Sequence, residues 1–127
     1  MLVEYLGHAC YFIRTPDVSV LVDPLVEERF QDDTAEVFPR RAIDLDAMPA
    51  PDIIVITHCH PGHLEVASLA RFDRRTQVLH PKDATIELAL TELGFRHRDV
   101  VEHGSFIAAG ETSILITGTV SDITEVG

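Results

Sequence analysis

The chain has 127 residues, 46% of them apolar, and its 10 basic and 21 acidic side chains give a formal net charge of −11. This length fits one domain with a single core, and the apolar content argues against a disordered chain. The acidity argues against nucleic-acid binding, which needs clustered Lys and Arg, and no apolar run approaches the roughly 18 to 20 residues that cross a membrane.

The first part of the chain predicts three consecutive antiparallel strands. Runs rich in β-branched and aromatic residues cover 2–6, 10–14 and 18–22, and turn-like residues separate them. The stretch from Asp23 to Asp52 contains nine of the 21 acidic residues and has no sustained period. We expect a long exposed connection there, with one helical turn near 42–47.

The rest of the chain alternates predicted strands and helices. The apolar run 52–57 lacks polar alternation, which predicts a strand buried on both faces. The later expected elements are a helix over 64–72, a strand over 77–80, a helix over 83–93 capped by Asp83 and stopped by Gly94, and strands over 100–102, 105–108 and 112–117. This order predicts an α/β fold, with a mixed sheet and helices on one face.

Three of the seven histidines lie within six residues, in Thr57-His58-Cys59-His60-Pro61-Gly62-His63. Because side chains alternate in an extended chain, His58 and His60 should point the same way at the carboxyl end of the buried strand. The turn at 61–62 can return His63 to the same cavity, where open α/β sheets usually place their sites. We predict a metal site; the alternative is a turn of solvated or hydrogen-bonded histidines. Imidazoles suit zinc, iron, manganese, nickel and copper.

The two cysteines, Cys10 and Cys59, show no repeated spacing, which favours buried thiols over a disulfide framework. The N-terminus lacks the basic start and apolar stretch of a secretory signal. We therefore expect a cytoplasmic protein.

Two further motifs accompany the histidine segment: the run 6–13 (Leu-Gly-His-Ala-Cys-Tyr-Phe-Ile) and the strand end 20–24 (Val-Leu-Val-Asp-Pro). Together the three motifs resemble the amino-terminal half of the metallo-β-lactamase-fold superfamily, whose signature reads His-x-His-x-Asp-His. Segments near 94–95, 100–102 and 113–118 are most similar to the branch that contains di-iron β-hydroxylases of nonribosomal peptide assembly and their hydrolase-like relatives.

The resemblance implies a four-layer αββα sandwich of two similar halves, with a metal centre at the edge between them. It implies that His58 and His60 hold one divalent metal, that the signature Asp and His63 hold a second, and that a metal-bound hydroxide is the nucleophile. It also implies that Asp23 orients the ligands, since metal-bound imidazoles commonly need a carboxylate partner.

Four histidines outside the segment divide into two pairs. His8 lies in the first turn, where the resemblance places a histidine near the site, and His80 ends a strand on the same side, where it could face a substrate. His97 and His103 lie in solvated turns, and we interpret them as structural.

The sequence departs from the family pattern in two ways. Gly62 replaces the signature Asp, which puts the second metal in doubt and makes a mononuclear or empty site an alternative. The chain is also about half of the usual fold, and ligands expected after 112–117 could come only from Asp122 or Glu125. We therefore expect either a fragment or truncated half of a longer protein, or a homodimer that covers an apolar face.

Three functions fit these observations. The first is a metal-dependent hydrolase, with zinc as the expected metal and iron or manganese as alternatives. The second is an iron-dependent oxygenase or hydroxylase on the same fold. The third is a catalytically inactive scaffold or assembly module, which the absence of Asp at position 62 favours.

Overall fold

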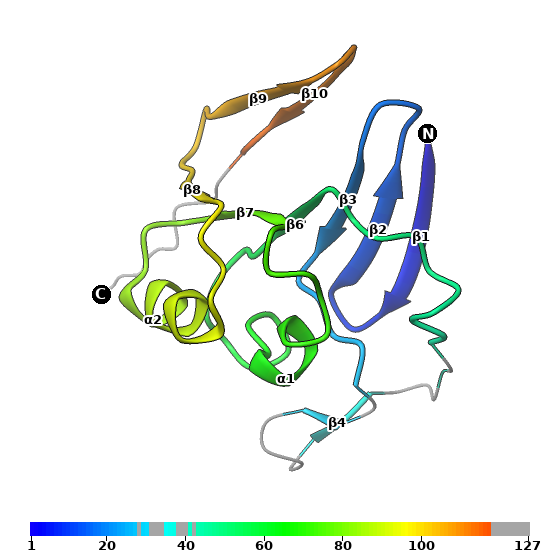
Figure 1. The fold of residues 1–127 in the computed structure, drawn as a ribbon, viewed down its shortest axis with the longest axis vertical. Coiled ribbons are helices and arrows are strands. Elements are labelled where there is room, and N and C mark those ends of the chain that lie inside the picture. Colours follow the sequence, from blue (N-terminus) through cyan, green and yellow to red (C-terminus); the bar gives the residue numbers. More distant parts are fainter. Residues whose placement is uncertain (28, 31–34, 38–40, 42, 118–127) are drawn as a thin grey trace.

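The computed structural model describes residues 1–27, 29–30, 35–37, 41 and 43–117, and its main feature is a six-stranded mixed sheet (Figure 1). In spatial order the strands are β1 (Leu2–Gly7), β2 (Cys10–Arg14), β3 (Ser19–Val22), β6 (Ile53–Val55), β7 (Gln77–His80) and β8 (Arg98–Val100). The other elements are two short hairpins, β4 (Arg29–Phe30) with β5 (Ala35–Glu36) and β9 (Phe106–Ala109) with β10 (Thr112–Leu115), and the helices α1 (Val66–Leu69) and α2 (Ala84–Leu93).

The sheet combines an antiparallel and a parallel part. Strands β1, β2 and β3 pair antiparallel, as the sequence predicts, and β3, β6, β7 and β8 pair parallel. Since β1 runs in the same direction as β3, the carboxyl ends of β1, β3, β6 and β7 all meet one edge of the sheet. The α/β fold with a mixed sheet is therefore confirmed.

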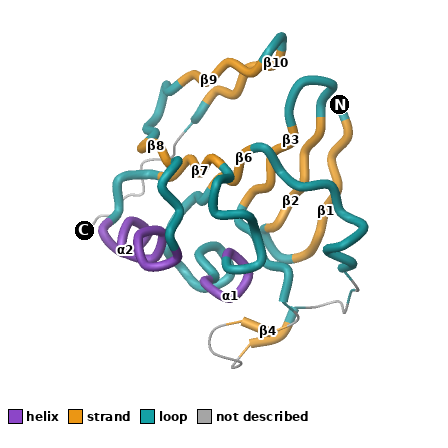
Figure 2. Tube along the Cα trace, in the orientation of Figure 1, coloured by secondary structure: helices purple, strands orange, loops and turns teal. Residues whose placement is uncertain are grey.

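The two faces of the sheet pack against different elements (Figure 2). On one face, α1 and α2 cover the larger core cluster, which includes Phe12, Ile54 and Leu90. On the other face, the β9–β10 hairpin covers a smaller cluster around Ile53 and Leu79. Because neighbouring residues of β6 belong to the two different clusters, its predicted burial on both faces is confirmed.

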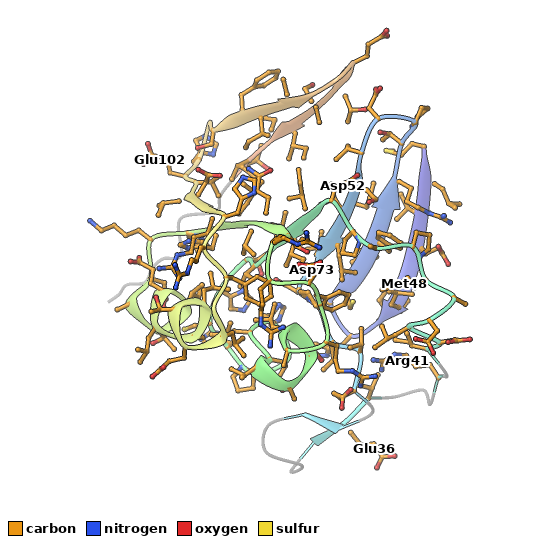
Figure 3. The ribbon with its side chains drawn as sticks, viewed as in Figure 1. Glu36, Arg41, Met48, Asp52, Asp73 and Glu102 are labelled. Atoms are coloured by element: carbon orange, nitrogen blue, oxygen red, sulfur yellow. The ribbon has the colours of Figure 1, made fainter. Side chains whose placement is uncertain are left out.

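The connection after β3 is not the wholly exposed loop that its charge suggests. Leu25, Val26 and Val37 are buried in the main core, and the Val26 N–H donates to the buried Ser68 hydroxyl at 2.9 Å. The expected helical turn is present, with the Met48 N–H bonded to the Asp44 carbonyl at 3.1 Å. Met48 lies beside β1, where it lines a cavity of about 380 Å³ (Figure 3).

Helix α2 matches its prediction at both ends. The Asp83 carboxylate accepts a hydrogen bond from the Ile86 N–H at 3.0 Å, and Gly94 closes the helix in a left-handed conformation. Neither helix in the described part of the chain is long and apolar enough to cross a bilayer.

Helix α1 is shorter than the nine residues predicted over 64–72. Its N-cap, Glu65, makes no side-chain cap bond, so the first turn lacks that support. After Leu69, the N–H groups of Arg71 and Phe72 bond to carbonyls three residues back, which tightens the chain into turns. Apolar spacing therefore identified the buried side of this segment but not the length of the helix.

Candidate metal centre

The candidate metal centre lies where the carboxyl ends of the parallel strands meet. Asp23 directly follows β3, and its N–H donates to the Val55 carbonyl, the last residue of β6, at 2.8 Å. Thr57 and His58 follow β6 closely, so the two adjacent strands deliver acidic and imidazole side chains to one point. This is the position at which open α/β sheets commonly bind ligands.

Three side chains there could hold one ion. Asp23, His58 and His63 each offer a ligand atom, and these atoms all lie within 4.8 Å of one another. The rings of His58 and His63 have centroids 3.9 Å apart, and the His8 ring lies 5.4 Å from that of His63. The expected return of His63 towards His58, and of His8 towards this edge, is therefore seen in the geometry.

Asp23 makes the central contacts of the group. Its Oδ1 accepts from the Thr57 N–H at 2.7 Å, and its Oδ2 accepts from the Thr57 hydroxyl at 2.6 Å. The same Oδ2 lies 2.6 Å from Nδ1 of His63. Although the Asp23 side chain is only 2% exposed, its carboxylate is fully hydrogen-bonded, as a buried acidic group must be.

Backbone conformation also marks this edge. In the described part of the chain, two non-glycine residues have positive φ: His8 at 53° and Asp23 at 45°. Such conformations are costly for residues with a side chain and cluster at functional sites. Both flank the histidine group, so strained backbone and candidate ligands coincide.

The charge state of His58 suits metal binding. Burial lowers the pKa of His58, and the neighbouring His63 and His60 lower it further, while Asp23 opposes the shift. The result favours a neutral imidazole, which is the form that binds metals.

The donor set fits one cation. Imidazole nitrogens and carboxylate oxygens are both ligands of zinc and of iron. Zinc holds such atoms at about 2.0 to 2.2 Å in a tetrahedral arrangement, so two of its ligand atoms are about 3.4 Å apart. The three atoms here lie within 4.8 Å of one another, so binding would require them to move closer together.

Gly62 contributes no ligand where the family signature has Asp. It adopts φ 87° and is buried, and its N–H donates to Oε2 of Glu65 at 3.1 Å. The glycine therefore serves the turn before α1, because left-handed backbone is easy only for a residue without Cβ.

The remaining predicted residues lie at different distances from the group. The His60 ring is exposed and lies 4.8 Å from that of His58, but His60 is not one of the three residues that converge. His80 is 1% exposed, with Nδ1 2.9 Å from the Pro81 carbonyl oxygen, so it is packed inside rather than facing solvent. His97 and His103 are exposed. Asp122 and Glu125 lie outside the described residues.

Both cysteines are free thiols. Cys10 is buried as expected, and burial raises the pKa of its thiol. Cys59 is only half-buried; burial raises the pKa of its thiol, and the adjacent Asp83 carboxylate raises it further.

Thr57 is the residue of this site to which the sequence reasoning gave no role. Its main chain and its hydroxyl both bond to Asp23, and its hydroxyl also lies 2.9 Å from Nδ1 of His58. A hydroxyl residue directly before the first histidine, at the end of a buried strand, was the available signal.

Comparison with known proteins decides the family. A family model described as the beta-lactamase superfamily domain matches residues 2–123. The chain belongs to the beta-lactamase superfamily. The metallo-β-lactamase resemblance drawn from the motifs is confirmed, and so is the half-sandwich fold, because a variant of CmlA beta-hydroxylase superposes with a TM-score of 0.72 at 25% identity. That superposition covers 93% of this chain and 24% of the hydroxylase chain.

Three related proteins align with different fractions of this chain. A UPF0173 protein of Pyrococcus abyssi is 29% identical over 90% of the chain, and a 4-amino-L-phenylalanyl-[CmlP-peptidyl-carrier-protein] 3-hydroxylase of Streptomyces venezuelae is 35% identical over 80%. A UPF0173 metal-dependent hydrolase of Salinibacter ruber is 36% identical over 50%. The chain spans 46%, 20% and 24% of the lengths of these relatives, respectively.

Proposed function

We propose that this chain supplies metal ligands of a metal-dependent hydrolase, with zinc as the expected cation and His58, His60 and His63 as its ligands. The observation that carries the proposal is the convergence of the His58 and His63 rings, with centroids 3.9 Å apart, beside the buried Asp23 carboxylate at the carboxyl ends of β3 and β6. The His60 ring lies 4.8 Å from that of His58, within reach of the same edge. The similarity to a UPF0173 metal-dependent hydrolase supports the reaction class.

The hydrogen bonds indicate which of these side chains are ligands and which one orients them. Asp23 orients the ligands rather than joining them, because its two oxygens already accept three hydrogen bonds. The bond between its Oδ2 and Nδ1 of His63 leaves Nε2 of that ring for the cation. When bound, a divalent cation supplies Lewis acidity and an activated water. Gly62 offers no carboxylate, so we propose one cation rather than two.

A second candidate is an iron-dependent hydroxylase that uses the same residues. It is supported by the 35% identity to the Streptomyces venezuelae hydroxylase and by the superposition on CmlA beta-hydroxylase. Imidazole and carboxylate groups bind either zinc or iron, so the residues alone fit both candidates. The two candidates are distinguished by which metal is bound.

Elemental analysis of protein purified without added metal separates the candidates. Stoichiometric zinc supports the hydrolase, and stoichiometric iron supports the hydroxylase. No metal after loading with either ion would overturn both and leave the inactive scaffold. The variants His58→Ala and His63→Ala should lose the metal, whereas the exposed histidine variants His97→Ala and His103→Ala should retain it.

A further inference from the structure

A chain of hydrogen bonds runs from Asp23 through Thr57 to His58. The Thr57 hydroxyl lies 2.6 Å from Oδ2 of Asp23 and 2.9 Å from Nδ1 of His58. The Thr57 N–H independently donates to Oδ1 of Asp23 at 2.7 Å. The Thr57 hydroxyl therefore lies between a carboxylate and an imidazole. The main-chain bond to Asp23 holds residue 57 in place and does not involve the hydroxyl.

The number of available protons fixes the direction of these bonds. A carboxylate only accepts, so the single hydroxyl proton of Thr57 goes to Asp23. The Thr57 oxygen must then accept, and the donor is the N–H at Nδ1 of His58. A neutral imidazole has one N–H, which leaves Nε2 of His58 with a free lone pair.

The same argument applies to the other ring of the group. Oδ2 of Asp23 also accepts from Nδ1 of His63 at 2.6 Å, so His63 has the same tautomer. One buried carboxylate thus sets both rings, His63 directly and His58 through Thr57. Both Nε2 atoms belong to rings whose centroids are only 3.9 Å apart.

We propose that Thr57 is a positioning residue that holds His58 in its Nδ1–H tautomer and so presents Nε2 to the divalent cation. The inference rests on the proposed function for the identity of the ligand, but the tautomer itself is a property of the metal-free chain. Loss of such an outer partner of a metal-binding histidine typically weakens metal affinity by about 10- to 100-fold.

The decisive variant is Thr57→Val, which removes the hydroxyl and retains the main-chain bond to Asp23. Two-bond ¹H–¹⁵N spectra of histidine-labelled, metal-free full chain, above the histidine pKa, report which ring nitrogen is protonated. We expect His58 to be Nδ1–H in the wild type and in Thr57→Ser, and a mixture of tautomers in Thr57→Val. Thr76→Val is the matched control. Thr76 directly precedes β7, at the amino end of that strand and away from the histidines, so this variant should give the wild-type spectrum.

Calorimetric titration with Zn²⁺ provides the second readout. Thr57→Val should bind about 10- to 100-fold more weakly than the wild type, with Thr57→Ser restoring the affinity. The proposal would be overturned if the His58 tautomer were unchanged in Thr57→Val. It would also be overturned if Thr57→Ser showed the same mixed tautomers and weak binding as Thr57→Val. A wild type that shows the Nδ1–H tautomer but binds neither Zn²⁺ nor Fe²⁺ would overturn the proposed function while supporting the hydrogen-bond chain.

Discussion

At the scale of single residues, position 62 is where this chain has glycine and the family signature has Asp. Gly62 combines a left-handed φ of 87° with burial, and its N–H bonds to Glu65. Among residues with a side chain, Asp and Asn tolerate this conformation best. The signature carboxylate can therefore be restored at an energetic cost, which makes its effect testable.

We expect Gly62→Asp to raise the metal content per chain from one ion towards two. The new carboxylate adds an oxygen ligand beside His63, and the backbone strain should lower the free energy of unfolding by about 1 to 2 kcal/mol. Metal content is measured by elemental analysis after zinc loading, and stability by thermal unfolding. Gly62→Ala is the control, with at least as much backbone strain and no carboxylate; equal metal content in the two variants would contradict the expectation.

At the scale of secondary structure elements, the sequence predicted well those features that depend on contacts between residues close together in the chain. Helix α2 was predicted because its cap Asp83 and its stop Gly94 act within one turn. The buried positions Leu25 and Val26 were missed because the contact that holds them, from the Val26 N–H to Ser68, spans 42 residues. Local composition, dominated by acidic residues, could not reveal it.

The same distinction applies to the site. The histidine spacing predicted a site at the carboxyl end of the buried strand, and the family resemblance placed Asp23 beside it. The structure brings the two together because β3 and β6 are parallel and end at one edge of the sheet. The role of Thr57 was not predicted, since it depends on which proton goes to which acceptor. The His60 ring lies 4.8 Å from that of His58 but outside the group of three, since β6 ends at Val55 and the chain bends at 59–60.

The N-terminus of α2 links this helix to the histidine segment through Asp83. We expect Asp83→Ala to lower the free energy of unfolding by about 1 kcal/mol, because the Ile86 N–H loses its cap. The same change should lower the pKa of the Cys59 thiol, since Asp83 raises it. Cys59 should then react faster with a thiol reagent at a fixed pH near 8. Glu92→Ala, on the same helix, is the control and should alter neither measurement.

The turn between α1 and β7 should make a pH-dependent contribution to stability. Hydrogen bonds from Arg75 lower the pKa of Asp73 to about 2 from its ordinary 3.8, and Asp73 lies in this turn (Figure 3). Because the folded-state pKa is depressed, the contribution is complete above the ordinary value and is lost as the pH falls through 2. The difference in urea midpoint between the wild type and Asp73→Asn should therefore shrink below about pH 5 and vanish below about pH 2.

The Asp73 contribution is small because the pair is exposed to solvent. Arg75→Gln should show a smaller pH-dependent loss than Asp73→Asn, because the main-chain N–H of residue 75 still donates to Asp73. A difference from the wild type that stays constant over this pH range would contradict the assignment to Asp73.

At the scale of the whole molecule, the sheet is covered unevenly. On the side opposite the helices, the hairpin covers the β6–β7 part, and the part on β1 and β2 is an open face that includes Val3, Tyr5 and Tyr11. Val3, Tyr5 and Tyr11 are 50%, 58% and 41% exposed, respectively. An apolar sheet face of this kind usually has a partner. We propose that it is covered by a second copy of the chain or by the second half of the fold.

If a second copy is the partner, self-association should depend on the tyrosine pair of the open face. Tyr5 and Tyr11 are cross-strand neighbours with ring centroids 5.0 Å apart, so they form one apolar contact surface. We expect the chain to dimerise in sedimentation velocity experiments and the double variant Tyr5→Ser, Tyr11→Ser to dimerise at least about tenfold more weakly, because the two side chains lose more than about 1.4 kcal/mol of burial. The control Leu88→Ser removes a 63% exposed apolar side chain from α2, outside the open face, and should leave the dimer unchanged. A wild-type chain that stays monomeric would exclude a second copy, and the second half of the fold would remain as the partner of this face.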